Sequence, residues 1–277
     1  MKVTAAINRF LRARLANHPG SDLLERYLSL GGAAALETQV NVAADNGEPV
    51  EGRHNTYTDG VNKWWSIRCP ENANSDPEWE DYELSYAPEE HAEGIGSTGW
   101  EWAARRSRWL GFDFDAVTAH AKGIGVTDEE LAEVCEAAKA IPYVETRRST
   151  GGKGIHLYVS FDGVGIPTRN HTEHAALGRC ILGMMSAETG FDFASQIDAC
   201  GHVCWLWHRK ITPENQGLSL VKPATKVLTV ADLPANWRDH IEVVTGRRTK
   251  IRVNGVDEDP FTLLTSTRRI IPLDPRF

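Results

Sequence analysis

The chain has 277 residues, 41% of them hydrophobic, which suffices for one large domain or two small ones with a real core. Its formal net charge of −8 argues against a protein that coats nucleic acid through bulk electrostatics, because neutralising phosphates needs clustered Lys and Arg. No apolar stretch approaches the roughly 20 residues that cross a bilayer, and arginines interrupt the N-terminal apolar residues. The five scattered cysteines indicate reduced thiols. We therefore expect a cytoplasmic protein with no membrane partner.

The N-terminal part of the chain divides into a helical and an irregular portion. Residues 1–36 are predicted to form a helical segment, because apolar residues recur there at helical spacing on both sides of the breaker Asn-His-Pro-Gly. Residues 37–100 are rich in Asn, Asp, Gly, Pro and Trp, with short strand-like pieces at 38–42 and 64–68. We expect an irregular α/β portion there.

The next predicted strand alternates aromatic and acidic residues. In the sequence WLGFDFDAV, Phe112 and Phe114 point to one side, and Asp113 and Asp115 point to the other, as in a half-buried strand. A helix is predicted at 127–141, because the capping box Thr-Asp-Glu-Glu precedes an apolar stripe with helical spacing.

A β-hairpin is predicted to follow this helix. It consists of a strand at 143–147, the turn Ser-Thr-Gly-Gly-Lys-Gly at 149–154 and a second strand at 155–161. Because side chains alternate along a strand, His156 and Tyr158 should point away from the apolar residues of the second strand.

The remaining elements of this region predict the fold class. A helix at 170–188, capped by Asn170 and Glu173, precedes strands at 195–199 and 204–210. The order β-α-β-β-α-β, followed by one extra strand, is the split βαβ arrangement, which is also called ferredoxin-like or RRM-like, so we expect an α+β fold. Both helices would then cover one face of the sheet. The residues expected to converge on its other, open face are Asp113, Asp115, His156 and Asp198.

The carboxylates of this face predict a metal site. Asp113 and Asp115 lie two residues apart on one side of a strand, and Asp198 on a neighbouring strand can complete an oxygen-rich site for two Mg²⁺ or Mn²⁺ ions. Two-metal phosphoryl transfer needs such a site. The alternative is that these residues are solvated surface acids.

The turn before His156 predicts a phosphate site. Its glycines let backbone N–H groups approach a phosphate, while Lys153 and His156 supply charge or hydrogen bonds. The turn is not a Walker A loop, because the spacing differs and a strand follows it instead of a helix. A flexible hairpin turn is the alternative interpretation.

Three ordered motifs in residues 109–210 carry a family resemblance. GFDFDA, then STGGKGIHLYV, then QID followed by WLWHRK resemble the motifs of the archaeo-eukaryotic primase superfamily. Many members of this superfamily have serine two places before the motif histidine. This chain has Gly154 at that place, and in this it resembles the polymerase domains of bacterial repair ligases. We favour the subgroup of phage and plasmid primase-polymerases.

The resemblance implies roles for individual residues. It implies that Asp113, Asp115 and Asp198 bind the catalytic metals, and that His156 holds the incoming triphosphate. The residues implied in support of His156 are Ser149, Gly151, Gly152 and Lys153. A basic residue shortly after the third motif usually contacts phosphate as well, and Arg209 and Lys210 fit that place.

The resemblance implies a template-dependent nucleotidyltransferase, a DNA primase and/or DNA polymerase, that joins NTPs or dNTPs on a single-stranded DNA template. The catalytic domain would span residues 37–245, with its core motifs at 109–210. Residues 246–277 would form a C-terminal extension that could lead into a further domain or partner, such as a helicase. One alternative is another two-metal enzyme, a nucleotidyl cyclase or a nuclease, on a similar palm. The other is a non-catalytic RNA-binding module of RRM type.

Zinc and base stacking are weaker candidates. The potential zinc ligands are His171, His174, Cys180, Cys200, His202 and Cys204. We favour core or cap roles for these residues, because the paired C-x₂-C spacing of a zinc ribbon is absent. Tryptophans could stack template bases, and the basic run 247–252 could grip template phosphates, but core packing and a solvated face are the favoured interpretations.

Overall fold

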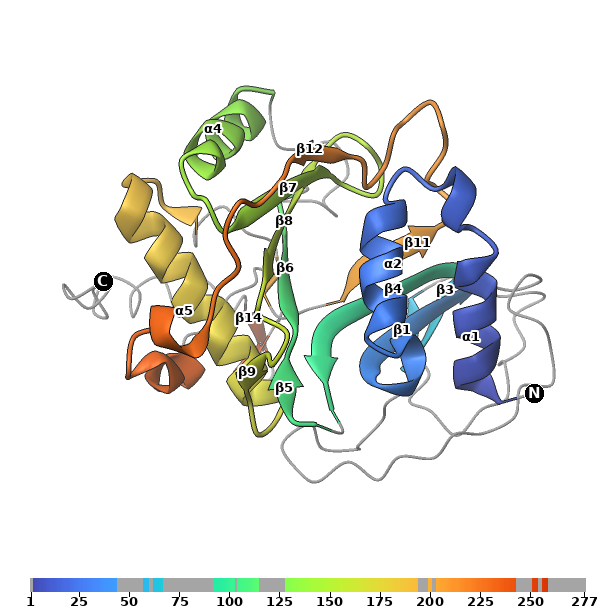
Figure 1. Ribbon diagram of the computed structural model, residues 1–277, viewed down its shortest axis with the longest axis horizontal. Helices are drawn as coiled ribbons and strands as arrows, with labels where there is room; N and C mark the ends of the chain where they lie inside the picture. Colours follow the sequence, from blue (N-terminus) through green and yellow to red (C-terminus); the bar gives the residue numbers. More distant parts are fainter. Residues whose placement is uncertain are drawn as a thin grey trace.

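The protein combines helices with antiparallel sheets, as the sequence predicted for an α+β fold (Figure 1). The computed structural model describes residues 2–43, 57–59, 62–66, 92–102, 104–114, 128–193, 199–200, 203–242, 251–253 and 256–258. Within these ranges, no helix has the length and apolar character needed to cross a bilayer.

One antiparallel sheet holds the predicted motifs. Its five described strands are, in spatial order, β10 (Ala199–Cys200), β6 (Trp109–Asp113), β8 (Ile155–Ser160), β7 (Val144–Arg148) and β12 (Leu220–Lys222). β6 and β8 are therefore neighbours, and β10 lies on the other side of β6. β7 and β8 form the predicted hairpin around residues 149–154.

Two helices pack on one face of this sheet, α4 (Asp128–Lys139) and α5 (His171–Thr189) (Figure 1). Phe112 and Phe114 of the alternating segment are buried in the core between the sheet and these helices, as predicted. The predicted cap of α5 is also present, because the Asn170 side chain accepts a hydrogen bond from the Glu173 amide at 3.0 Å. The predicted cap residue Thr127 and most of the predicted strand 195–199 lie outside the described residues.

The second antiparallel sheet is built from the N-terminal half of the chain and two later strands. Its order is β2 (Tyr57–Asp59), β3 (Asn62–Ser66), β1 (Leu36–Ala43), β4 (Ala92–Glu101), β5 (Arg106–Ser107) and β9 (Ile166–Pro167), while β11 (Cys204–His208) pairs with β4. The strand-like pieces predicted at 38–42 and 64–68 correspond to β1 and β3. The other described elements are η1 (Leu15–Asn17), η2 (Gly32–Ala34), η3 (Val230–Asp232), η4 (Trp237–Glu242), β13 (Ile251–Val253) and β14 (Val256–Glu258).

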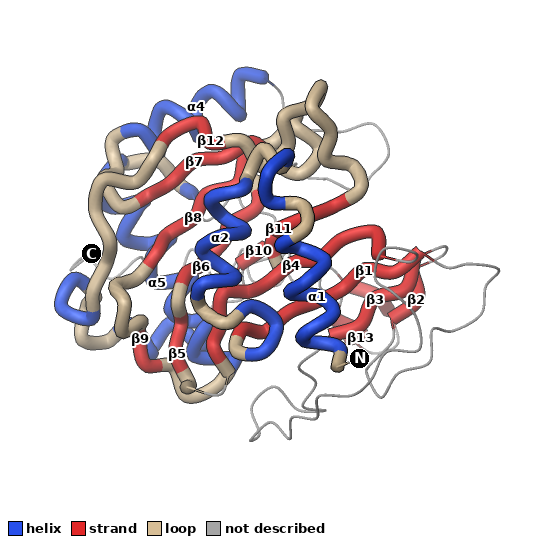
Figure 2. Tube along the Cα trace, turned by 45° about the vertical axis from the view of Figure 1, so that its right-hand side comes forward, coloured by secondary structure: helices blue, strands red, loops and turns tan. Residues whose placement is uncertain are grey.

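The N-terminal helices α1 (Val3–Arg12) and α2 (Ser21–Ser29) form a second core that connects the two sheets. Both helices lie over the sheet that contains β1 and β4 (Figure 2). Phe10 and Tyr27 of these helices share this core with Trp109 of β6 and Tyr158 of β8.

The face opposite α4 and α5 is consequently not open, which corrects our prediction. Tyr158 has no exposed surface and His156 is 2% exposed. The apolar stripes of α1 and α2 must be buried somewhere, and this face receives part of them. β11 also crosses β6 closely, because a Cβ atom on Gly111 would lie 2.3 Å from the Cys204 Sγ atom.

Candidate functional site

Three polar side chains form a row across the covered face of the five-stranded sheet. Asp113 of β6 is paired in register with His156 of β8, and His156 is paired with Arg147 of β7. The His156 Nε2 atom lies 3.5 Å from the Asp113 Oδ1 atom. The Asp113 side chain keeps 31% of its surface exposed, so this end of the row reaches solvent. Two of the predicted metal ligands, Asp115 and Asp198, lie outside the described residues, although Ala199 pairs with Asp113.

Tyr158 contacts the Nδ1 side of the His156 ring. The Tyr158 hydroxyl lies 3.4 Å from the His156 Nδ1 atom, and the two rings meet edge to face. Burial raises the pKa of Tyr158 well above its ordinary value, so the phenol keeps its proton. When this hydroxyl donates to Nδ1, the Nε2 atom carries the imidazole proton and can donate toward the Asp113 side.

The predicted phosphate loop, residues 149–154, is closed by its own hydrogen bonds. The Ser149 amide donates to the Gly154 carbonyl at 2.8 Å, and the Gly152 amide donates to the Ser149 carbonyl at 2.9 Å. The Ser149 hydroxyl accepts from the Gly154 amide at 2.9 Å and is buried. Ser149 therefore closes the loop through both its backbone and its hydroxyl oxygen.

Other donors of the phosphate loop have no acceptor among the residues that the structure describes. The amides of Thr150, Gly151 and Lys153 donate to no residue that the structure describes. The Thr150 hydroxyl is buried, and it too has no hydrogen-bond partner among the described residues. Lys153 is exposed, and there is open space around Gly151. Such a group of backbone donors beside a lysine suits an anion.

Residues 211–218, which follow the third sequence motif, pack against the phosphate loop. We call them the brace segment. A Cβ atom on Gly152, whose φ is +76°, would lie 2.2 Å from the Asn215 carbonyl oxygen. A Cβ atom on Gly217 would lie 2.5 Å from the Thr150 carbonyl oxygen. These contacts require glycine at both positions, so the backbones of the two loops touch directly.

The two predicted basic phosphate ligands have different surroundings. The Arg209 Nη1 atom forms an ion pair with Glu93 at 3.0 Å, and its Nε atom donates to the Ala92 carbonyl at 2.9 Å. Lys210 is exposed, and its carbonyl accepts a hydrogen bond from the Asn215 side chain of the brace segment. Lys210 is thus connected to the phosphate loop through Asn215, whereas Arg209 is held by β4.

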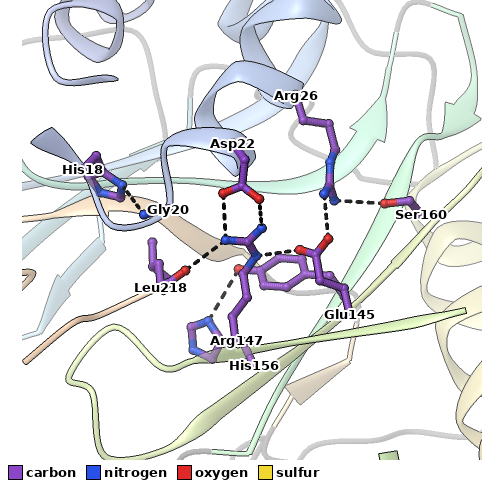
Figure 3. A network of polar contacts seen from close by, with 10 residues as sticks. His18, Gly20, Asp22, Arg26, Glu145, Arg147, His156, Ser160 and Leu218 are labelled. Carbon is purple, nitrogen blue, oxygen red and sulfur yellow. Dashed lines mark hydrogen bonds and ion pairs between the residues drawn. The ribbon is translucent and has the colours of Figure 1, made fainter. Parts of the chain in front are cut away.

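Arg147 is the centre of a buried polar network that the sequence did not predict (Figure 3). Its guanidinium, which has no exposed surface, donates to both carboxylate oxygens of Asp22, to Glu145 at 2.5 Å and to the Leu218 carbonyl at 3.0 Å. Glu145 also accepts from Arg26 at 2.7 Å. Burial alone would lower the pKa of Arg147, but Asp22 and Glu145 raise it. The sequence signal was available, because Arg147 falls on the same side of its strand as Glu145.

Three of the zinc candidates, His174, Cys180 and Cys204, are buried. Both ring nitrogens of His174 are engaged, Nδ1 with the Ser107 hydroxyl at 2.7 Å and Nε2 with the Thr98 carbonyl at 2.9 Å. Cys180 is buried in the core, and burial raises the pKa of its thiol to about 12. Over the described ranges, no three His, Cys, Asp or Glu side chains are grouped as a metal site. His202 lies outside these ranges.

His18, next to the Arg147 network, makes stability depend on pH. Burial is the main cause that lowers its pKa from 6.5 to about 4, although its Nδ1 atom accepts from the Gly20 amide at 3.0 Å. As the pH falls, the His18 imidazole is protonated in the unfolded state before it is protonated in the folded state. The free energy of unfolding should therefore fall as the pH drops from 6.5 toward 4. His18→Asn retains an acceptor for Gly20 but cannot titrate. In urea unfolding, the free energy of unfolding of His18→Asn should fall less steeply with decreasing pH than that of the wild type, by roughly 1 kcal/mol per pH unit in this window. Parallel curves for the two proteins would contradict a buried, neutral His18.

Comparisons with known proteins add one structural likeness. No protein-family model matches the chain, and no curated protein matches it. Among solved structures, the chain is similar to the polymerase domain of ligase D from Mycobacterium tuberculosis in complex with DNA. The sequence identity is 16%, the TM-score is 0.33, and the match covers 82% of this chain and 85% of that chain. A TM-score of this size carries no conclusion about fold or function.

Proposed function

We propose that the chain is a template-dependent nucleotidyltransferase of the primase-polymerase type. The observation that carries the proposal is the position of Asp113 beside His156 on neighbouring strands, with a loop just before His156 whose amides at Thr150, Gly151 and Lys153 have no acceptor among the described residues. In this proposal the five-stranded sheet with α4 and α5 is a split βαβ palm. The order of the three sequence motifs supports the same assignment.

The proposed metal ligands are Asp113, Asp115 and Asp198. Asp113 fits the role, because its carboxylate is partly exposed at the end of the polar row and oxygen donors suit Mg²⁺ and Mn²⁺. When bound, two such ions would activate the attacking 3′-hydroxyl and stabilise the pyrophosphate that leaves. The carboxylates would fix the positions of these ions relative to the sheet.

The protein side chains and amides would bind the triphosphate. The amides of Thr150, Gly151 and Lys153 supply backbone donors, and the Lys153 ammonium adds charge. His156 would donate from Nε2 to a phosphate oxygen, with the Tyr158 hydroxyl fixing its ring. Of the two basic residues after β11, the contact through Asn215 favours Lys210, and Arg209 would keep β4 in place.

The covered face disfavours an RNA-binding module of RRM type. Such modules stack bases on exposed aromatic residues of the sheet. Here Tyr158, the aromatic residue of β8 on that face, is fully buried beneath the N-terminal core. A nucleotidyl cyclase or a nuclease would use the same acids, and template dependence distinguishes them from a polymerase.

A direct test is incubation with single-stranded DNA, Mg²⁺ or Mn²⁺ and labelled NTPs or dNTPs, with and without a primer. The proposal requires products whose sequence copies the template. Cyclic nucleotides, degraded DNA, or metal-independent RNA binding without incorporation would each overturn it in favour of a named alternative.

Substitutions of His156 should separate its two ring nitrogens. Glutamine can place a donor near the position of Nε2, whereas asparagine can mimic only Nδ1. A hydrogen bond to a charged group contributes about 1.5–3 kcal/mol, so His156→Asn should raise the KM for the nucleotide by about tenfold or more. His156→Gln should retain more of the affinity, with thermal unfolding as the control for folding. Equal or reversed effects would show that Nε2 does not contact the nucleotide.

A further inference from the structure

We infer that Asp22 of α2 and Arg147 of β7 form a clamp that positions the phosphate loop through the brace segment. This inference rests on the proposed function, because the loop is assigned to the nucleotide there. Asp22 and Arg147 would be positioning residues, since neither is among the residues proposed to contact the metal ions or the nucleotide. The consequence is that an N-terminal helix outside the sequence motifs controls the affinity for the nucleotide.

The clamp joins three parts of the chain at one guanidinium. Asp22 binds Arg147 through both carboxylate oxygens, which fixes the plane of the guanidinium. The Arg147 Nη1 atom also donates to the Leu218 carbonyl at 3.0 Å, at the end of the brace segment. α2, β7 and the brace segment therefore meet at the buried Arg147 side chain (Figure 3).

The brace segment depends on these contacts for its conformation. Gln216 and Leu218 have φ values of +54° and +64°, which are costly for residues other than glycine. Leu218 is held on two sides: its amide donates to the Arg148 carbonyl at 3.2 Å, and a Cβ atom on Gly20 would lie 3.0 Å from the Leu218 Cβ atom. The start of α2 thus packs directly on the strained part of the brace segment.

The other side of the brace segment contacts the phosphate loop, so the brace segment helps to position this loop. The carbonyl of Asn215 lies against Gly152, and Gly217 lies against the carbonyl of Thr150. Because these contacts are between backbones, a shift of the brace segment must move the loop or open a gap beside it. Asn215 is itself fixed, since its side chain accepts from the amides of Thr212 and Gly217.

Asp22 can be altered without removing the anchor of α2. The Asp22 side chain is 52% exposed, whereas Leu23, Leu24 and Tyr27 bury the apolar face of the helix. Asp22→Asn retains one oxygen for Arg147 but turns an NH₂ group toward the other guanidinium nitrogen. Glu25→Gln is the matched control, because Glu25 is an exposed acid on the same helix and its replacement also removes one negative charge.

Two measurements test the clamp, and one of them is independent of activity. Hydrogen exchange should be faster in Asp22→Asn than in Glu25→Gln at the amides of Gly152, Gly154, Leu218 and Ser219, which are all hydrogen-bonded in this region. In steady-state incorporation, Asp22→Asn should raise the KM for the nucleotide about tenfold with little change in kcat. Asp22→Glu should restore most of this affinity.

Gly217→Ala provides a second variant that leaves the ion pair intact. Its new methyl group would press on the Thr150 carbonyl, so the same rise in KM is expected. Unchanged exchange in Asp22→Asn would overturn the clamp, whatever the activity. Faster exchange with an unchanged KM would overturn its role in nucleotide positioning. A wild-type protein that incorporates no nucleotide would refute the proposed function, while the exchange comparison would still decide whether the clamp holds the loop.

Discussion

Asp113→Ala is expected to reduce template-dependent nucleotide incorporation by about three orders of magnitude. The carboxylate is the described member of the proposed metal site, and metal ions contribute several kcal/mol to charge stabilisation in phosphoryl transfer. Because Asp113 lies at the end of β6 with its side chain partly exposed, the fold should tolerate alanine there. Primer extension at saturating Mg²⁺ or Mn²⁺ measures the loss.

Glu133→Gln is the control for this experiment. Glu133 is an exposed acid of α4, on the far side of the α4–α5 core from the polar row, and its replacement should leave incorporation unchanged. If Asp113→Ala retained the full metal-dependent activity of the wild type, the proposed site would be wrong.

Gly152→Ala is expected to damage both the phosphate loop and the affinity for the nucleotide. The φ of +76° costs a residue with a Cβ atom roughly 1–2 kcal/mol, and that atom would also collide with the Asn215 carbonyl. The free energy of unfolding should therefore fall by about 2 kcal/mol. The KM for the nucleotide should rise at least about tenfold, because the amides of Gly151 and Lys153 on either side of Gly152, proposed here to bind phosphate, would move.

Gly151→Ala is the matched control, since the added methyl group would meet nothing within 4 Å. Gly151→Ala should change the free energy of unfolding by less than about 0.5 kcal/mol. Its effect on KM then reports how closely a phosphate approaches Gly151 itself. Equal stability losses for the two variants would show that the left-handed conformation at Gly152 is not what the loop requires.

The local patterns in the sequence predicted the elements that carry the motifs. Alternation of Phe112 and Phe114 with Asp113 was enough to place the aromatic residues in the core and the acid on the other face. The hairpin around 149–154 and the cap of α5 were also predicted correctly. These features depend on contacts between residues close in sequence, so a single chain shows them directly.

The covering of the polar face could not be predicted in the same way. The face was expected to be open, but Tyr158 is buried in the core that includes α1, α2 and β11, and His156 is 2% exposed. The amphipathic pattern of α2 predicts an apolar face, but it does not indicate against which sheet this face packs. Likewise, the motif did not indicate that the Ser149 hydroxyl accepts a hydrogen bond from the Gly154 amide and closes the loop internally.

The sequence by itself determined the α+β class, the alternation of β6 and β8 and the candidate residues, because those follow from the periods of strands and helices. Only the tertiary structure decided which of the described residues meet. Asp22 and Arg147 are 125 residues apart in the chain, yet they share two hydrogen bonds. Their meeting depends on how the N-terminal core packs against the five-stranded sheet, and burial selects that packing without leaving a local pattern.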